Sequence, residues 1–106
     1  MDFGHGKITY WEFSVDFSKS FEDQLEYLTE DLVQVEYPGG YLVDIGWYPE
    51  YDADGEFIVQ LIRLGNWGTP EYRCRTRTRE GLQQGIETAL AVMERNMPLQ
   101  KDGGHL

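Results

Sequence analysis

Acidic side chains at alternate positions around a glycine form the pattern in this chain that comes closest to a metal-binding loop. The pattern comprises Glu50, Asp52, Asp54, Gly55 and Glu56. Carboxylates spaced in this way can converge on a hard cation such as Ca²⁺. The register argues against a calcium loop, because the position that needs a bidentate glutamate is Leu61 if Glu50 takes the first position. We therefore expect a solvated acidic turn and no metal ion.

Arginines occur at every second position over residues 73–79, and an arginine row on a strand can bind phosphates. A phosphate site needs a basic environment, however, and the net charge of this chain is -10. We therefore expect these arginines to form cross-strand ion pairs with carboxylates such as Glu12, Asp44 or Glu56.

The sequence contains no recognisable catalytic combination of residues. His5 and His105 lie near the two ends of the chain, and Cys74 has no histidine near it in sequence. The carboxylates are scattered over several predicted elements, where exposure to solvent is the default. We expect a protein without a cofactor and without enzymatic activity. A small hydrolase or metal-dependent enzyme is an alternative that a deep pocket of converging carboxylates would favour.

The charge of the chain is unevenly distributed. Residues 1–65 hold 14 of the 19 Asp and Glu residues and three basic residues, which gives a net charge of -11. Residues 66–106 hold six basic and five acidic residues, which gives +1. A strongly acidic surface repels nucleic acids and anionic membranes and attracts basic proteins. We therefore expect a protein partner, with no binding to nucleic acid or membrane.

Two apolar runs on either side of the acidic turn predict a central β-hairpin over residues 41–63. In the first run, every second residue is Tyr41, Val43, Ile45 or Trp47, and the second run, residues 57–62, is apolar at nearly every position. Residues 9–17 and 72–77 also have the period of a strand. Residues 33–37 predict a short edge strand before a Pro-Gly-Gly break.

Helical spacing of apolar residues predicts one helix over residues 20–32 and another from a Thr78 cap to about Asn96. Together these elements predict a single α+β domain over residues 1–97. It consists of an antiparallel sheet of four to five strands with two helices packed on one face, in the order β-α-(β)-β-β-β-α. The tail, residues 98–106, is predicted to be disordered.

The expected location is the cytoplasm. No apolar run approaches the ~18 residues of a membrane span, and the first residues lack the features of a signal peptide. The single cysteine, Cys74, cannot form a disulfide within the chain, which is typical of a reducing compartment.

The 15 aromatic residues separate into a predicted core and a predicted surface. The alternation assigns Trp11, Phe13, Phe17, Phe21 and Phe57 to the core. Tyrosines and tryptophans at strand ends or in connections are typical interface anchors, although such rings can also cover the end of a core. Combined with nearby carboxylates, they give the predicted partner-binding residues: Glu22, Glu26, Glu30, Tyr48, Glu50, Tyr51, Asp52, Asp54 and Trp67.

Three segments together resemble small immunity proteins of bacterial contact-dependent growth inhibition and related polymorphic toxin systems. They are VDIGWYPEYDADGEFIVQLI, the NWGTP turn and TREGLQQGIETAL, within about residues 42–93. The resemblance implies an antitoxin that binds the C-terminal toxin domain of a cognate protein, often a nuclease, inside the cell and blocks its active site. These proteins share no toxin-binding residues, so none is transferred by position. The alternative is an acidic regulatory or adaptor domain that binds a protein through a sheet edge.

Overall fold

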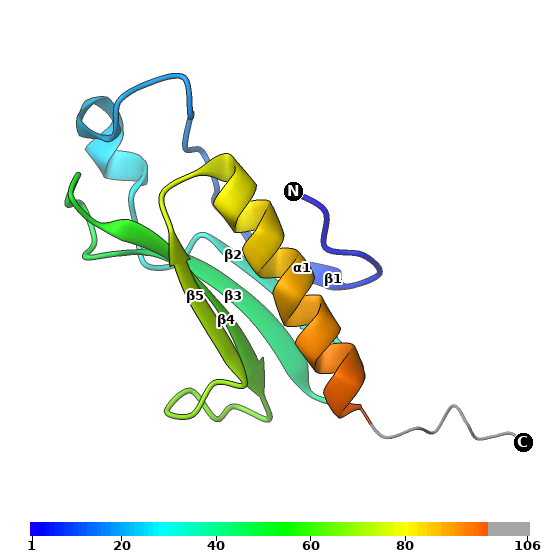
Figure 1. The fold of residues 1–106 in the computed structure, drawn as a ribbon. Helices are drawn as coiled ribbons and strands as arrows, with labels where there is room; N and C mark the ends of the chain where they lie inside the picture. The colour runs from blue at the N-terminus through cyan, green and yellow to red at the C-terminus, as the bar shows by residue number, and fades with distance from the viewer. Residues whose placement is uncertain (98–106) are drawn as a thin grey trace, which may run out of the picture.

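In a computed structural model of the chain, which describes residues 1–97, five strands form one antiparallel sheet in the order β1-β2-β3-β4-β5 (Figure 1). The strands are β1 (Lys7–Trp11), β2 (Val33–Tyr37), β3 (Tyr41–Tyr48), β4 (Glu56–Arg63) and β5 (Tyr72–Thr76). The described helices are a 3-10 helix, η1 (Phe21–Tyr27), and an α-helix, α1 (Arg79–Asn96). The predicted α+β class and antiparallel sheet are confirmed. The predicted disordered tail, residues 98–106, lies outside the described residues.

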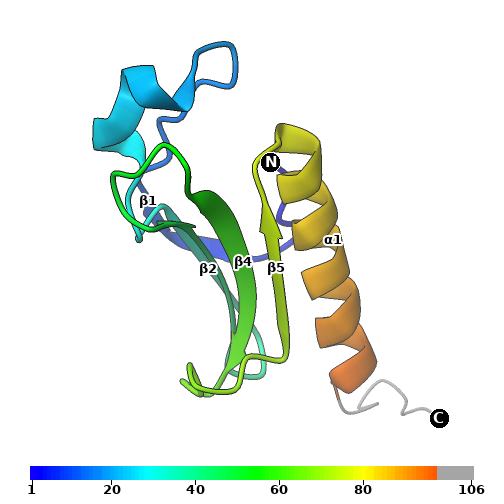
Figure 2. The same cartoon turned by 60° about the vertical axis from the view of Figure 1, so that its left-hand side comes forward.

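The helix α1 covers one face of the sheet, where it packs against β3, β4 and β5 (Figures 1 and 2). It begins after Thr78, whose side chain accepts a hydrogen bond from the Gly81 backbone N–H at 2.9 Å, and it ends at Asn96, as predicted. Gly85 allows α1 to approach β5 closely, since a Cβ at this position would lie 2.6 Å from the Cys74 Sγ. This close packing explains why α1 contains a glycine here, although glycine weakens an isolated helix.

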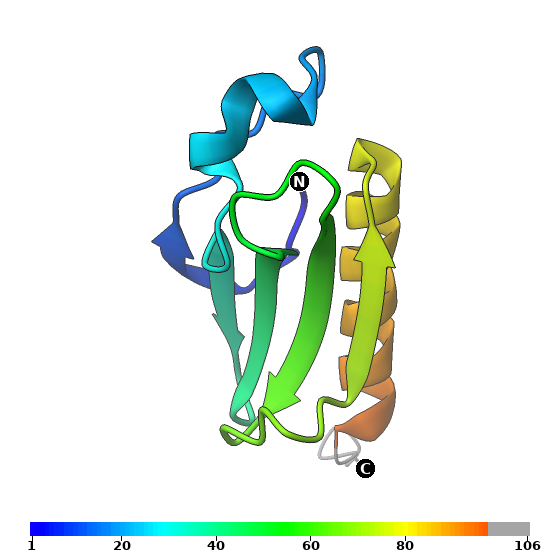
Figure 3. The same ribbon diagram turned by 90° about the vertical axis from the view of Figure 1, so that its left-hand side faces the viewer.

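The predicted central hairpin is formed by β3 and β4, which pair without interruption from Tyr41↔Arg63 to Tyr48↔Glu56. Residues directly opposite each other share a face of the sheet. The face toward α1 therefore carries fully buried apolar side chains: Val43, Ile45, Trp47, Phe57, Val59 and Leu61. The other face of the sheet, which we call the open face, is turned toward the viewer in Figure 3. It carries a row of polar residues across four strands: Gln34, Asp44, Gln60 and Arg73.

The first helix is shorter than predicted, and its type is different. The prediction of a helix over residues 20–32 is wrong, because η1 is a 3-10 helix that ends at Tyr27. Gln24 interrupts it with φ -143° and ψ 37°. The Gln24 side chain is buried, and its amide exchanges hydrogen bonds of 2.8 Å with both the backbone N–H and the carbonyl of Asp16. These hydrogen bonds to the loop before η1 hold Gln24 in a non-helical conformation, so a regular helix does not form here.

The segment after η1 lies against the end of β3, to which it is joined by backbone hydrogen bonds. The Leu32 N–H donates to the Ile45 carbonyl at 3.0 Å, and the Trp47 N–H donates to the Thr29 carbonyl at 2.8 Å. Leu28, with φ -95° and ψ 78°, caps the C-terminal end of η1, and Leu32 lies beyond this helix, so neither is buried as part of a regular α-helix. The spacing of Leu28 and Leu32 resembles that of a helix because both residues are buried, although they lie in the connection between η1 and β2.

The strand predicted over residues 9–17 ends early, at Trp11. Beyond it, the Glu12 N–H donates to the Leu32 carbonyl at 2.8 Å, and the chain then leaves the sheet. The prediction that Trp11 is a core residue is wrong, since this side chain is 48% exposed. The strand β2 forms as predicted, but it is an interior strand and not an edge strand, because β1 pairs with its outer side.

The backbone of Glu30 crosses the open face directly over Gly46. A Cβ at Gly46 would lie 1.9 Å from the Glu30 carbonyl oxygen and 2.8 Å from its carbon. Any side chain at this position would have to displace a backbone segment that carries sheet hydrogen bonds. Gly46 therefore fixes where the connection from η1 lies on β3.

We expect Gly46→Ala to lower the free energy of unfolding by roughly 2–4 kcal/mol, because the added methyl group overlaps the Glu30 backbone. The matched control is Gly68→Ala, where an added Cβ meets nothing within 4 Å. Urea unfolding of both variants measures the difference. Equal stability of the two variants would contradict the placement of residues 28–32 on β3.

Candidate functional site

Aromatic rings gather where the hairpin end of the sheet meets η1. The ring centroids of Phe21 and Trp47 lie 4.6 Å apart, and those of Trp47 and Phe57 lie 4.8 Å apart in an edge-on arrangement. Phe13 and Phe17 lie 5.9 Å and 5.8 Å from Phe57. Each aromatic pair of this kind stabilises a fold by about 0.5–1.5 kcal/mol beyond its buried area. These five rings, which we call the aromatic cluster, join η1 and the loop before it to the hairpin.

Arg77 links the aromatic cluster to the β3–β4 connection. Its guanidinium lies 4.7 Å from the centroid of the Phe21 ring. The same group donates hydrogen bonds to the backbone carbonyls of Gly55 and of Ala53, the latter at 3.2 Å. Stacked guanidinium groups that also donate hydrogen bonds hold their partners in a fixed geometry. The arginine that looked like a phosphate ligand in the sequence therefore positions a loop.

The β3–β4 connection and η1 lie side by side at this end of the molecule (Figures 1 and 3). The Tyr51 N–H donates to the Leu28 carbonyl at 2.7 Å. The Glu50 carboxylate accepts a hydrogen bond from the Glu30 N–H at 3.2 Å. Within the connection, the Trp47 indole N–H donates to the Asp52 carbonyl at 2.7 Å.

Residues 20–31 and 49–56 together contain nine carboxylates and no basic side chain. We call the surface that these two segments form the acidic end. The negative field extends to neighbouring groups: desolvation raises the pKa of the Tyr48 phenol, and Asp44, Glu30 and Asp31 raise this pKa further. The acidity that the sequence assigned to the first half of the chain is thus concentrated at one end of the sheet.

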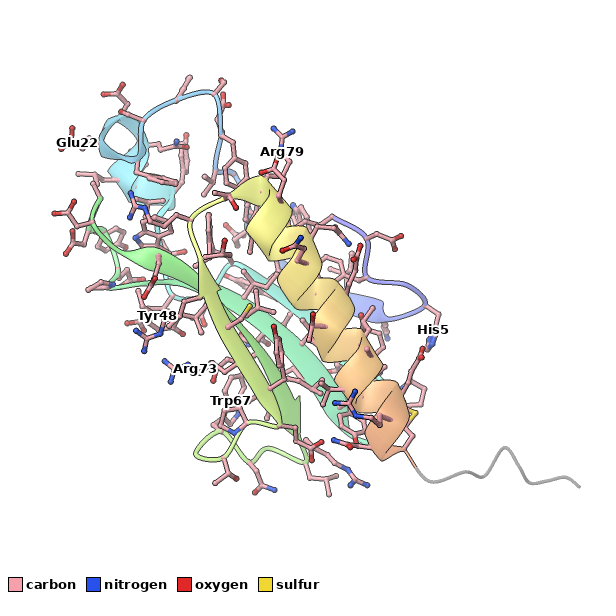
Figure 4. All side chains as sticks on the ribbon, viewed as in Figure 1. His5, Glu22, Tyr48, Trp67, Arg73 and Arg79 are labelled. Atoms are coloured by element: carbon pink, nitrogen blue, oxygen red, sulfur yellow. The ribbon has the colours of Figure 1, made fainter. Side chains whose placement is uncertain are left out.

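The structure brings together all the predicted partner-binding residues except one. Seven of them belong to the acidic end itself: Glu22, Glu26, Glu30, Glu50, Tyr51, Asp52 and Asp54. Tyr48 lies beside them, and its hydroxyl donates to the Glu30 carbonyl at 3.4 Å. Trp67 lies in the β4–β5 connection at the opposite end of the sheet, so it is not part of this surface (Figure 4).

Two hollows border η1 at this end of the molecule. The larger, about 660 Å³, lies between η1, the β3–β4 connection and the start of α1, and its lining is mixed in charge, with Glu22 and Asp54 opposite Lys19, Arg77 and Arg79. The smaller, about 290 Å³, is lined by four carboxylates and two tyrosines: Tyr10, Glu12, Glu26, Tyr27, Asp31 and Glu50. We call the smaller one the acidic hollow.

Six residues that line the acidic hollow were not among the predicted site residues: Tyr10, Glu12, Ser14, Tyr27, Thr29 and Asp31. The alternation of residues 9–17 places Tyr10 and Glu12 on the polar face of the predicted strand, which indicates that both side chains are exposed. The sequence could not show that Tyr10 and Glu12 lie beside η1, because their position depends on the backbone hydrogen bonds that join residues 28–32 to β3.

The arginines of β5 lie on the open face. Arg75 forms an ion pair with Glu56 at 3.3 Å, which confirms one of the predicted pairings. Asp44 is instead 2% exposed in the middle of this face, where the Gln34 amide donates to its carboxylate at 3.0 Å. A buried carboxylate that is bonded to a neutral amide is stabilised less than one paired with arginine. Arg73 and Arg75 line a shallow hollow of about 550 Å³ with Tyr48 and Ile58.

No metal centre is found among residues 1–97, where no three histidine, cysteine or acidic side chains are grouped so that they could hold an ion. Within the same residues, no helix has the length and apolar character needed to span a membrane. Comparison with models of known protein families gives no match, and neither do searches of curated proteins and of solved structures.

We expect the stability of this protein to depend on the ionisation of Asp44. The pKa of this carboxyl is raised from 3.8 to about 6, mainly because the group is buried and in small part because of the nearby charge of Asp31, and the Gln34 hydrogen bond opposes the shift. The folded state thus binds a proton more tightly than the unfolded state. The free energy of unfolding therefore falls as the pH rises through the window between these two pKa values.

Asp44→Asn removes the cost of ionising a buried carboxyl group, and it keeps a side-chain oxygen that can accept the hydrogen bond from Gln34. Relative to the unmodified protein, it should be more stable at pH 7.5 by at most about 3 kcal/mol and equally stable near pH 4. Thermal unfolding across this pH range measures the difference. A stability difference that does not change with pH would contradict the assigned shift.

Arg77→Ala should lower the free energy of unfolding by roughly 1–2 kcal/mol and speed amide exchange in the β3–β4 connection, because hydrogen bonds to two loop carbonyls are lost. The control is Arg73→Ala, which removes another exposed arginine from the same segment of the chain. If both variants exchange equally, Arg77 does not hold the loop.

Proposed function

We propose that this protein is an immunity protein that binds a basic toxin domain, a nuclease being the best candidate, and neutralises it without catalysis by covering its active site. The observation that supports the proposal most is the acidic end: nine carboxylates on two segments that the fold holds against each other. A nuclease holds the phosphates of its substrate with basic residues, and a surface of fixed carboxylates can take the place of those phosphates.

The exposed rings near these carboxylates provide the second requirement of a tight inhibitor. Tyr51 is 57% exposed and Tyr27 is 44% exposed, both within the acidic end. Tyrosine anchors bury a large area with little loss of side-chain entropy, and they lower the rate of dissociation. Complementary charge raises the rate of association. Together, these effects give fast and persistent inhibition.

The fixed geometry of the acidic end also favours binding. The Tyr51 N–H is bonded to the carbonyl of Leu28, the residue that follows η1, so the loop is already ordered before a partner arrives. Ordering a loop during association would cost free energy that is then lost from the affinity.

The second candidate function, an acidic adaptor domain that binds a neutral protein through a sheet edge, is favoured by one observation. All five residues of the edge strand β1 are exposed. The two functions differ in their response to salt, since binding of a neutral partner is insensitive to ionic strength.

If a large secreted protein is encoded immediately upstream of the gene for this chain, its C-terminal domain is the first partner to test. Co-expression of the chain should protect cells from this domain, and isothermal titration should give an affinity that falls as salt concentration rises. A domain that remains toxic in the presence of the chain would contradict the proposal.

Reversal of two charges in the β3–β4 connection, Asp52→Lys with Asp54→Lys, should weaken binding to this basic domain by about tenfold or more and flatten its salt dependence. The control is Glu87→Lys with Glu94→Lys on the exposed side of α1, which makes the same change in net charge away from the acidic end. Unchanged affinity and salt slope in the Asp52 and Asp54 variant would remove this loop from the interface.

A further inference from the structure

The sheet has two edges, and they differ in charge and in exposed apolar area. The edge strand β5 carries Arg73 and Arg75, whose charges discourage a basic strand from pairing there. The edge strand β1 carries three large exposed side chains: Ile8 (50%), Tyr10 (39%) and Trp11 (48%). An unpaired strand with exposed apolar side chains is a template for the addition of another strand.

A bulge in β1 directs these side chains to both faces of the sheet. Pairing with β2 shifts between Ile8 and Tyr10, so that Ile8 lies opposite Val35, Tyr10 opposite Gln34, and Trp11 opposite Val33. Ile8 and Trp11 therefore share the face of the sheet that α1 covers elsewhere, while Tyr10 lies on the open face. Since α1 packs against β3, β4 and β5, it does not cover the side chains of β1.

Each face of the β1 edge leads to a different hollow. Tyr10 lines the acidic hollow together with Glu26 and Asp31. The pKa of the Tyr10 phenol is raised by desolvation and then by Glu12 and Asp31, which agrees with a negative field at this point. Trp11 lines a second hollow of about 420 Å³ with a mostly apolar wall that includes Phe13, Val15 and Leu82.

We propose that an extended segment of a basic partner adds to the edge of β1 as a sixth strand, with an apolar side chain in the hollow beside Trp11 and a lysine or arginine in the acidic hollow beside Tyr10. Side chains of a strand alternate between the two faces of a sheet, so an added strand presents neighbouring residues to opposite hollows. The proposal rests on the proposed function, because it assumes the same basic partner, and it names the part of the surface that this partner enters.

Charge complementarity selects this occupant. The acidic hollow has four carboxylates in its lining and no basic side chain. A second copy of this chain would bring its own β1 edge and acidic end against the same carboxylates, which like-charge repulsion opposes. A segment that alternates lysine or arginine with apolar residues matches both hollows.

The test uses the full chain labelled with ¹⁵N and a short synthetic peptide in which lysine alternates with valine. The peptide should shift the amide resonances of β1 and slow their hydrogen exchange, because strand addition pairs the unpaired backbone groups of the edge. A peptide with glutamate in place of lysine should leave these resonances unchanged.

Trp11→Ala should weaken binding of the lysine peptide by about tenfold. Trp67→Ala is the matched control, since Trp67 is 47% exposed at the other end of the sheet, and it should bind as the unmodified chain does. Glu26→Gln with Asp31→Asn should weaken binding and reduce its salt dependence, whereas Glu87→Gln with Glu94→Gln on α1 should not.

Shifts confined to β5 or to residues 49–56, or no shifts up to the solubility limit of the peptide, would overturn the strand addition. Those outcomes leave the proposed function standing, because it is tested separately by protection of cells from the toxin domain. Conversely, if the chain binds the peptide at β1 but neutralises no basic domain, the docking site is supported and the immunity function is refuted.

Discussion

Packing of Trp47 and Phe57 against the rings of Phe13, Phe17 and Phe21 is the interaction on which the acidic end depends. Nine carboxylates without a basic side chain repel one another, and each exposed pair costs a few tenths of a kcal/mol. A 3-10 helix as short as η1 contributes little stability of its own. Apolar burial and aromatic contacts therefore hold η1 and the β3–β4 connection together against the repulsion of their own charges.

The same arrangement makes the surface suitable for inhibition. A protein that depends on carboxylates for binding gains most when these are fixed in advance, because the cost of bringing them together is met during folding and not during association. Arg77 helps to fix the β3–β4 connection. Its guanidinium donates hydrogen bonds to the backbone carbonyls of Gly55 and Ala53 and stacks on the Phe21 ring. Arg77 thus holds the loop that carries Asp52 and Asp54 without pairing with their carboxylates. Among the nine carboxylates of the acidic end, Glu56 is in an ion pair, with Arg75.

The sequence predicted the elements whose apolar pattern and caps agree with each other: the hairpin at residues 41–63, the strand β5, and α1 with its Thr78 cap. It failed where a single tertiary contact decides the local structure. The apolar spacing of residues 20–32 favours a helix, but the buried Gln24 and the pairing of Leu32 with Ile45 impose another path. The acidic hollow forms because the path of residues 28–32 brings Glu26, Asp31 and Glu50 close to Tyr10. The position of Trp67 at the opposite end of the sheet follows from the antiparallel strand order.

Hydrogen–deuterium exchange of this chain, alone and in the presence of a saturating concentration of the basic domain that it is proposed to neutralise, tests the central claim most directly. The proposed mode of inhibition predicts that exchange slows in residues 7–11, 20–31 and 49–56 on binding. Protection limited to β5 and α1, with unchanged exchange in the acidic end, would contradict it.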